Sequence, residues 1–291
     1  MRAESRRSVP GIMHGASATG QTVFLEPFET VEVNNQLVQL AEDEAAEILR
    51  ILRELTERLQ VVREPLLVAA ETIAELDGVF ARGRFARDFD ASMPEFSDAS
   101  ELRLVEARHP VLEDKLRREE RAVVPLTLAL GGAEKVLVIS GPNTGGKTVA
   151  LKTTGLAALA AQSAIPVAAQ RAVLPVFDRV LVDIGDEQSI AADLSTFSAH
   201  MLNLKTMLGL ATPASLALVD EMGTGTAPEE GAALAVALLD EFRAKNCIVL
   251  ATTHHDRLKT YASTTPGVVN AAVEFDDVNL RPTYRLMVGV P

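Results

Sequence analysis

The hydrophobic and polar positions follow two different patterns, and the change between them lies near residue 90. Before it, apolar residues recur every three or four positions from residue 41 to residue 80. A period of about 3.5 residues predicts long helices with one apolar stripe, of the kind that packs against another helix. The stripe comprises Ala41, Ala45, Ile48, Leu52, Leu55, Leu59, Val62, Leu66, Ala69, Ile73, Leu76 and Phe80. Pro65 lacks the N–H that would bond to Val61, so we expect a kink or turn within residues 61–65.

Residues 1–90 are therefore expected to form a helical segment, with two long helices after an irregular, glycine-containing start. The simpler interpretation is a structural helix pair. The functional interpretation is a lever that relays movement from an attached machine.

After residue 100, short apolar runs alternate with helical patterns. The expected strands span 135–140, 179–183, 216–219 and 247–252, and the expected helices span 147–162, 195–210 and 229–245. Apolar strands separated by helices predict an α/β fold with a mostly parallel sheet covered on both faces. Two weakly alternating segments, 268–275 and 283–288, are expected to add edge strands. We expect residues 91–291 to form this second domain, entered through a linker at 88–100.

Composition narrows the class of protein. The chain of 291 residues is 47% hydrophobic and 23% charged, which is typical of globular proteins and not of disordered ones. One cysteine excludes a disulfide framework and a cysteine-built zinc site. No apolar run approaches the ~20 residues of a membrane span, and no secretory signal is present. We therefore expect a cytoplasmic protein with no membrane partner, and the ending at 289–291 without a closing helix suggests a truncation.

The net charge of −12, from 40 acidic and 28 basic residues, argues against a protein that coats DNA through bulk charge. The acidic balance does not exclude binding of nucleic acid through one local basic patch. The candidate phosphate contacts, each of which is alternatively solvated surface, are Arg82, Arg84, Arg87, Lys115, Arg117, Arg118 and Arg121.

A glycine-rich segment follows the first apolar run and carries the clearest chemistry. Residues 141–148 match the phosphate-binding loop pattern GxxxxGK[ST], between an expected strand and an expected helix. The segment reads Gly141, Pro142, Asn143, Thr144, Gly145, Gly146, Lys147 and Thr148. Backbone N–H groups of such a loop surround phosphates at a helix N-terminus. Lys147 is expected at the β- and γ-phosphates, and Thr148 at Mg²⁺.

Two acidic residues follow another apolar run at 216–219. Asp220 is positioned to hold Mg²⁺ through water, and Glu221 to orient or deprotonate the attacking water. His254 ends the next apolar run, where a histidine can bond a γ-phosphate; an idle surface histidine is the alternative.

Residues from three further segments complete the predicted site. Ser195 or Thr196 suits the N-cap of a helix, where a partner subunit would offer a hydroxyl and free amides to a nucleotide at an interface. Gln188 is a candidate polar sensor between the nucleotide and the helical segment. The glycines of residues 223–226 would allow close approach of a second molecule or a phosphate.

These motifs, in this order, resemble the MutS family of ATPases. The resemblance rests on GPNTGGKT (141–148), the STF helix start (195–197), DEMGTGT (220–226) and TTH (252–254). The segment EARHPVL (106–112) resembles the strand and turn that lead into the family's ATPase domain. The opening, from SVPG (8–11) to NN (34–35), is similar to the MutS-II branch, which is linked to control of recombination.

The resemblance implies an ABC-type P-loop ATPase that hydrolyses ATP with Mg²⁺ and holds nucleotides between two subunits of a homodimer. It implies binding of branched DNA and suppression of homologous recombination, with stalled ribosomes and their rRNA as another site of action. The branch's nuclease domain has no counterpart here, so no nuclease residue is assigned. Where the family has an Asn-Asp pair after Val-Pro, this chain has Leu126-Thr127 after Val124-Pro125, so no adenine contact is assigned.

Two other functions are compatible with the motifs. A transporter nucleotide-binding subunit would share them, but a helical segment before the ATPase domain argues against it. A non-hydrolysing scaffold, switched by nucleotide, is the second alternative, and the presence of Glu221 argues against it.

Overall fold

The computed structural model describes residues 1–142, 145–185, 193–276 and 281–290, with side chains left out at 193–196. The chain divides into two compact units, Met1–Asp77 and Gly78–Pro291. The division falls inside a helix, and the predicted boundary at residue 90 lies just past the end of that helix.

The first unit contains a hairpin and the helices that follow it. The elements are the 3-10 helix η1 (Ala3–Ser8), β1 (Gly11–Ala16), β2 (Val23–Pro27), α1 (Phe28–Val61) and α2 (Arg63–Asp88), which continues into the second unit. The start of the chain is thus not irregular, because β1 and β2 pair antiparallel. Each strand is too short for its alternation to stand out in the sequence. Val23 is the buried hydrophobic residue of this unit.

The predicted break between the two long helices is confirmed. α1 ends at Val61, Val62 caps it, and α2 begins at Arg63. Pro65 therefore lies in the first turn of α2, where its missing N–H costs no hydrogen bond. Neither helix buries a residue, so the apolar stripe is exposed in the described structure. Periodicity predicted the helices and their apolar face, but it did not specify what covers that face.

A six-stranded sheet forms the centre of the second unit, in the order β12-β11-β6-β10-β9-β8. All neighbours are parallel except β12, which pairs antiparallel with β11 at the edge. The predicted mostly parallel sheet and the two added strands are confirmed. The strands are β6 (Val136–Ser140), β8 (Arg179–Asp183), β9 (Ser215–Val219), β10 (Ile248–Thr253), β11 (Val268–Asp276) and β12 (Arg281–Val288).

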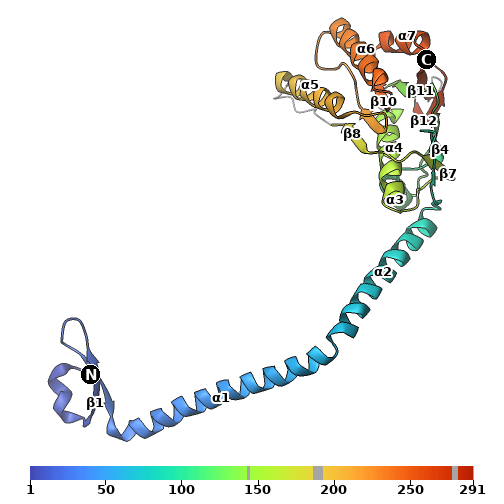
Figure 1. Ribbon diagram of the computed structural model, residues 1–291. Coiled ribbons are helices and arrows are strands. Elements are labelled where there is room, and N and C mark those ends of the chain that lie inside the picture. Colours follow the sequence, from blue (N-terminus) through green and yellow to red (C-terminus); the bar gives the residue numbers. More distant parts are fainter. Residues whose placement is uncertain (143–144, 186–192, 277–280, 291) are drawn as a thin grey trace. The chain divides into compact units, whose positions relative to one another are not determined.

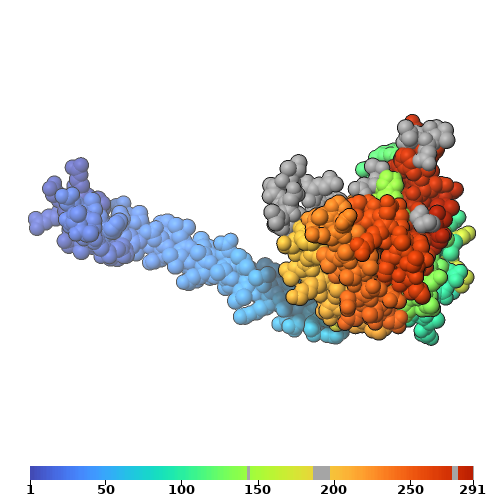
Figure 2. All heavy atoms as spheres, turned by 90° about the horizontal axis from the view of Figure 1, so that it is seen from above, coloured from blue at the N-terminus to red at the C-terminus, as the bar shows by residue number. Residues whose placement is uncertain are grey.

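Helices cover both faces of this sheet, as the apolar runs predict (Figure 1). Each face of the sheet has its own cluster of buried hydrophobic residues. Successive residues of a strand point to opposite faces, so alternate side chains of one strand belong to different clusters. Leu137 and Ile139 pack in the core with α4 (Lys147–Gln162), and Val136 and Val138 pack in the other core. That second core includes α5 (Asp193–Leu210), α6 (Pro228–Ala244) and α7 (Asp256–Thr264). Figure 2 looks onto the orange-to-red surface that α6 and α7 contribute.

A second sheet of four strands, β3-β7-β4-β5, was not predicted. β4 pairs antiparallel with both β5 and β7, and β3 pairs parallel with β7. Such pairings join residues far apart in the sequence, which periodicity within one segment cannot predict. The predicted strand and turn at 106–112 contain the end of β4 and the start of a helix, α3. These elements are β3 (Glu95–Phe96), β4 (Leu102–Ala107), α3 (Pro110–Arg118), β5 (Leu126–Leu130) and β7 (Arg171–Leu174).

Among the described helices, none is long and apolar enough to cross a lipid bilayer.

Candidate functional site

The glycine-rich segment connects the end of β6 to the start of α4. Gly141 and Gly146 have φ angles of 127° and 95°, which residues with a Cβ rarely adopt. A Cβ on Gly145 would lie 3.1 Å from a side-chain carbon of Val273, so a larger residue here would press on that side chain. Gly145 N–H donates to the carbonyl of Pro142 across the turn (3.0 Å). Asn143 and Thr144 lie outside the described residues.

Lys147 begins α4 and is buried, with 2% of its surface exposed. Its Nζ donates to the Gly141 carbonyl at 2.6 Å, so the side chain lies along the inside of the loop. Burial lowers the pKa of Lys147, while the charges of Glu221 and Asp220 act in the opposite direction. The cation and the two carboxylates therefore belong to one electrostatic site.

Asp220 lies at the carboxyl end of β9, beside the glycine-rich segment. Thr148 Oγ1 donates to Asp220 Oδ2 at 2.6 Å. The other carboxylate oxygen, Oδ1, accepts from the Thr252 hydroxyl. Because β6, β10 and β9 are parallel neighbours, their carboxyl ends place these residues at the same edge of the sheet.

Glu221 is half-buried and has a left-handed backbone, with φ at 48°. That conformation is unfavourable for a residue with a side chain. Its N–H donates to Thr252 Oγ1 at 2.7 Å, which holds the strained backbone in place.

His254 is exposed just beyond β10, and its ring lies 4.3 Å from the ring of His255. The pKa of His254 is lowered, first by loss of water around the ring and then by the charge of His255. Glu221 acts in the opposite direction and Lys147 in the same one. The lowered pKa favours the neutral imidazole, and the ring lies within electrostatic reach of both groups.

The structure begins α5 before the predicted helix cap. α5 already includes Asp193, so Ser195 and Thr196 are within the helix and neither is its N-cap. The side chains of these two residues, and Gln188 as a whole, lie outside the described part of the structure.

Two glycines of the loop 223–226 lie close to other elements of the same chain. A Cβ on Gly223 would lie 2.6 Å from the Gly231 carbonyl oxygen in α6. A Cβ on Gly225 would lie 3.2 Å from Cβ of Phe197 in α5. The glycines at these two positions therefore allow close contact with α6 and α5.

An apolar pocket of about 430 Å³ opens next to the glycine-rich segment. Gly146 and Thr148 line one side, and Val124 and Pro125 line another. Leu126 also lines the pocket, although no adenine contact was assigned to Leu126-Thr127 from the sequence. Because the pocket is lined by several separate segments of the chain, no single sequence motif predicts it. The apolar run before β5 does form part of its wall.

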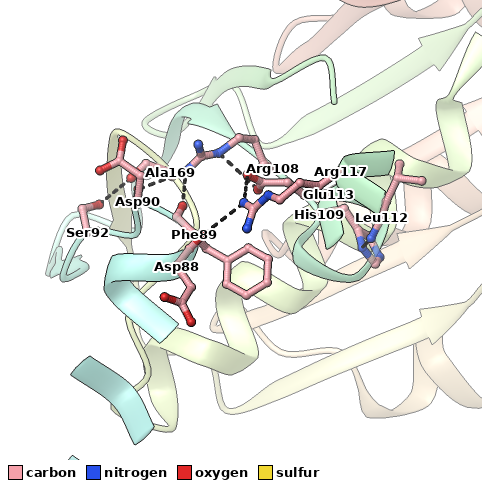
Figure 3. Close-up of polar contacts among 10 residues, drawn as sticks. All are labelled: Asp88, Phe89, Asp90, Ser92, Arg108, His109, Leu112, Glu113, Arg117 and Ala169. Carbon is pink, nitrogen blue, oxygen red and sulfur yellow. Dashed lines mark hydrogen bonds and ion pairs between the residues drawn. The ribbon is translucent and has the colours of Figure 1, made fainter. Parts of the chain in front are cut away.

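α3 forms a further wall of the pocket and is anchored on its far side to the end of α2 (Figure 3). Arg108 donates to the carbonyls of Phe89 and Asp90, and Arg117 donates to the carbonyl of Asp88. The Arg117 guanidinium also stacks over the Phe89 ring, 5.4 Å from its centroid. The Asp88 carbonyl, at the end of α2, has no partner within the helix, and the two arginines satisfy it and the two carbonyls that follow.

Most of the candidate phosphate-binding arginines have acidic partners. Such pairing reduces the positive potential that a DNA backbone would meet. The pairs are Arg87 with Asp88 (2.8 Å), Arg117 with Glu113 (3.0 Å), Arg118 with Asp114 (2.6 Å) and Arg121 with Glu119 (3.2 Å).

Comparison with known proteins identifies the family. The family model described as MutS domain V matches residues 137–289, which include the glycine-rich segment, Asp220, Glu221 and His254. The chain belongs to the MutS family. The resemblance predicted from the motifs is thereby confirmed.

The whole length of this MutS-family chain is similar to part of proteins named Endonuclease MutS2. The one from Thermomicrobium roseum is 48% identical over 303 residues, covering 100% of the chain and 38% of that protein. Those from Geobacillus thermodenitrificans and Clostridium botulinum are 46% and 44% identical over 292 residues, with 36% of each covered. These matches confirm the MutS-II branch, and the chain spans little more than a third of these relatives.

Proposed function

We propose that this chain is an ABC-type P-loop ATPase of the MutS-II type, which binds and hydrolyses ATP with Mg²⁺. The observation that carries the proposal is the 2.6 Å hydrogen bond from Thr148 Oγ1 to Asp220 Oδ2. It joins the end of the glycine-rich segment to the acidic end of β9, the two halves that a nucleotide site with a metal requires.

The residues at this contact fit Mg²⁺. A hydroxyl and a carboxylate are oxygen donors, which Mg²⁺ prefers. No group of three or more His, Cys, Asp or Glu side chains suited to a metal occurs among the described residues. Mg²⁺ in nucleotide sites usually keeps several waters and binds phosphate oxygens, so two protein ligands, Thr148 and Asp220, are compatible with it. Thr148 and Asp220 would hold the ion, which would supply positive charge to neutralise the negative charge that develops on the phosphates during transfer.

The chain's own groups take complementary roles around the phosphates. The loop amides and the Lys147 ammonium bind phosphate oxygens, and Glu221 orients the attacking water and accepts its proton. A neutral His254 bonds the γ-phosphate and loses that contact after hydrolysis. The pocket lined by Val124, Pro125 and α3 accommodates the adenine, because its apolar walls adjoin the loop.

We further propose that two copies close on ATP, with Ser195 and Thr196 of each facing the other's nucleotide, and that the dimer acts on branched DNA to suppress recombination. The STF and TTH motifs and the family membership support this part. Two copies that close and open with the nucleotide state would grip and release DNA.

Steady-state ATP hydrolysis across a range of protein concentrations, with and without a four-way DNA junction, tests the proposal. We expect the rate per chain to rise with concentration and to change when the junction is added. A Lys147→Ala variant, which removes the phosphate-binding cation, should lose ATP affinity. Unchanged affinity in that variant would contradict the phosphate site.

The other outcomes separate the parts of the proposal. A concentration-dependent rate that is indifferent to DNA would retain the dimeric ATPase and assign DNA binding to segments of the relatives that this chain does not span. A rate per chain that is constant with concentration would contradict the two-subunit site. ATP binding without any hydrolysis would favour the non-hydrolysing switch.

A further inference from the structure

One buried hydroxyl, that of Thr252, connects the two acidic residues of the site. Thr252 lies two residues before His254 on β10, and none of its surface is exposed. Its Oγ1 accepts from the Glu221 N–H at 2.7 Å and donates to Asp220 Oδ1. Its carbonyl accepts from the Met222 N–H at 2.9 Å. Three successive residues after β9 are thus held by one residue of β10.

The hydroxyl also determines which oxygen of Asp220 faces the glycine-rich segment. Thr252 binds Oδ1, and Thr148 binds Oδ2 at 2.6 Å. The carboxylate is therefore fixed between two hydroxyls, with Oδ2 directed to the side where the metal would lie. Without Thr252, the carboxylate could rotate about its last bond, and either oxygen could turn to that side.

The second bond of the hydroxyl acts on Glu221. This residue has φ at 48°, a conformation that persists only where its surroundings hold it. The Glu221 N–H bond to Thr252 and the Met222 N–H bond to the same residue lie on either side of the strained position. They fix the backbone from which the Glu221 carboxylate extends.

We propose that Thr252 is a positioning residue of the ATP site, whose hydroxyl orients Asp220 toward the metal and Glu221 toward the attacking water. This inference rests on the proposed function, since it concerns the same site. In the sequence, Thr252 belongs to the TTH motif (252–254) without an assigned role, and only the structure reveals its contacts.

Replacement of the hydroxyl tests the inference. Thr252→Val removes it at nearly constant shape, and Thr252→Ser retains it. Thr154→Val is the matched control, because the Thr154 hydroxyl is equally buried but donates to the Ala150 carbonyl within α4. We expect Thr252→Val to lower kcat by about tenfold or more, the effect of losing a hydrogen bond to a charged group. Thr252→Ser should recover most of that loss.

A second measurement does not depend on turnover. Affinity for a fluorescent ADP analogue is measured in EDTA and in Mg²⁺, and the gain from metal is compared between variants. We expect Thr252→Val to reduce this gain several-fold while its affinity in EDTA and its melting temperature match those of Thr154→Val. Should Thr252→Val fail to fold, Thr252→Ala replaces it.

The outcomes distinguish the two proposals. The role of Thr252 would be overturned if Mg²⁺ increased the affinity for the ADP analogue equally in the unmodified chain and in Thr252→Val. It would also be overturned if Thr252→Ser lost as much activity as Thr252→Val. No metal-dependent gain in the unmodified chain would overturn the proposed ATP site itself, and with it the role of Thr252.

Discussion

At the scale of single residues, Glu221 is the side chain that the proposed function assigns to activation of the attacking water. It has a left-handed backbone and it shares an electrostatic site with Lys147 and His254. Glu221→Gln keeps the size of the side chain but removes the base. We expect kcat to fall about 10²–10⁴-fold, the usual contribution of general-base catalysis.

ATP binding should persist in Glu221→Gln, so ATP-bound dimers should accumulate. Hydrolysis assays and size-exclusion chromatography with ATP measure the two effects. A variant with a nearly normal rate and no stabilised dimer would show that another group activates the water.

Cys247 illustrates a residue whose chemistry is suppressed by its place in the fold. It is fully buried just before β10, and burial raises the pKa of its thiol to about 11. The thiolate, which is the reactive form, is therefore scarce at pH 8. We expect Ellman's reagent to modify Cys247 only after unfolding in guanidinium chloride. Modification of the native protein at the rate of a free thiol would contradict this burial.

At the scale of elements, the joint between α2 and α3 depends on contacts between residues about twenty to thirty positions apart in the sequence. Arg108 holds two carbonyls beyond the end of α2, and 20% of its side chain is exposed (Figure 3). Arg108→Met should destabilise the fold by about 1–3 kcal/mol, since it leaves partly buried carbonyls without a charged donor.

Arg118→Met serves as the control for that change. Arg118 makes an exposed i,i+4 pair with Asp114, so its loss should cost about 0.5 kcal/mol or less. Urea denaturation measures both free energies of unfolding. Equal effects of the two substitutions would show that the Arg108 contacts do not stabilise the joint.

At the scale of the whole molecule, the buried core lies almost entirely in the second unit. The first unit has Val23 as its buried hydrophobic residue, whereas the second contains both clusters of buried residues. We expect residues 78–291 alone to unfold cooperatively, with a midpoint close to that of the whole chain.

Residues 1–77 alone should lose helix gradually on heating, because long exposed helices without a core do not melt as a unit. Circular dichroism during thermal unfolding measures both fragments. A sharp transition in 1–77, or an unfolded 78–291 fragment, would contradict this division.

The sequence by itself determined the elements whose pattern is complete within one segment. The helix at 147–162 and the strand at 179–183 have the predicted bounds, because α4 buries alanines at helical spacing and β8 is a short run rich in valine and leucine between turns. The break near Pro65 was predictable for the same reason, since proline acts on its own backbone. The glycine-rich segment could be recognised because its backbone geometry requires glycine at fixed positions.

Only the tertiary structure decided which segments meet. The four-stranded sheet, the pocket at Val124 and Pro125, and the contacts of Thr252 all join residues that are distant in the sequence. A threonine in an apolar strand has the same local sequence pattern whatever its hydroxyl contacts. The pattern does not show whether the hydroxyl bonds the backbone nearby or a carboxylate at the end of a neighbouring strand. Local periodicity records which face of an element is buried, but the partner of that face depends on how the whole chain packs.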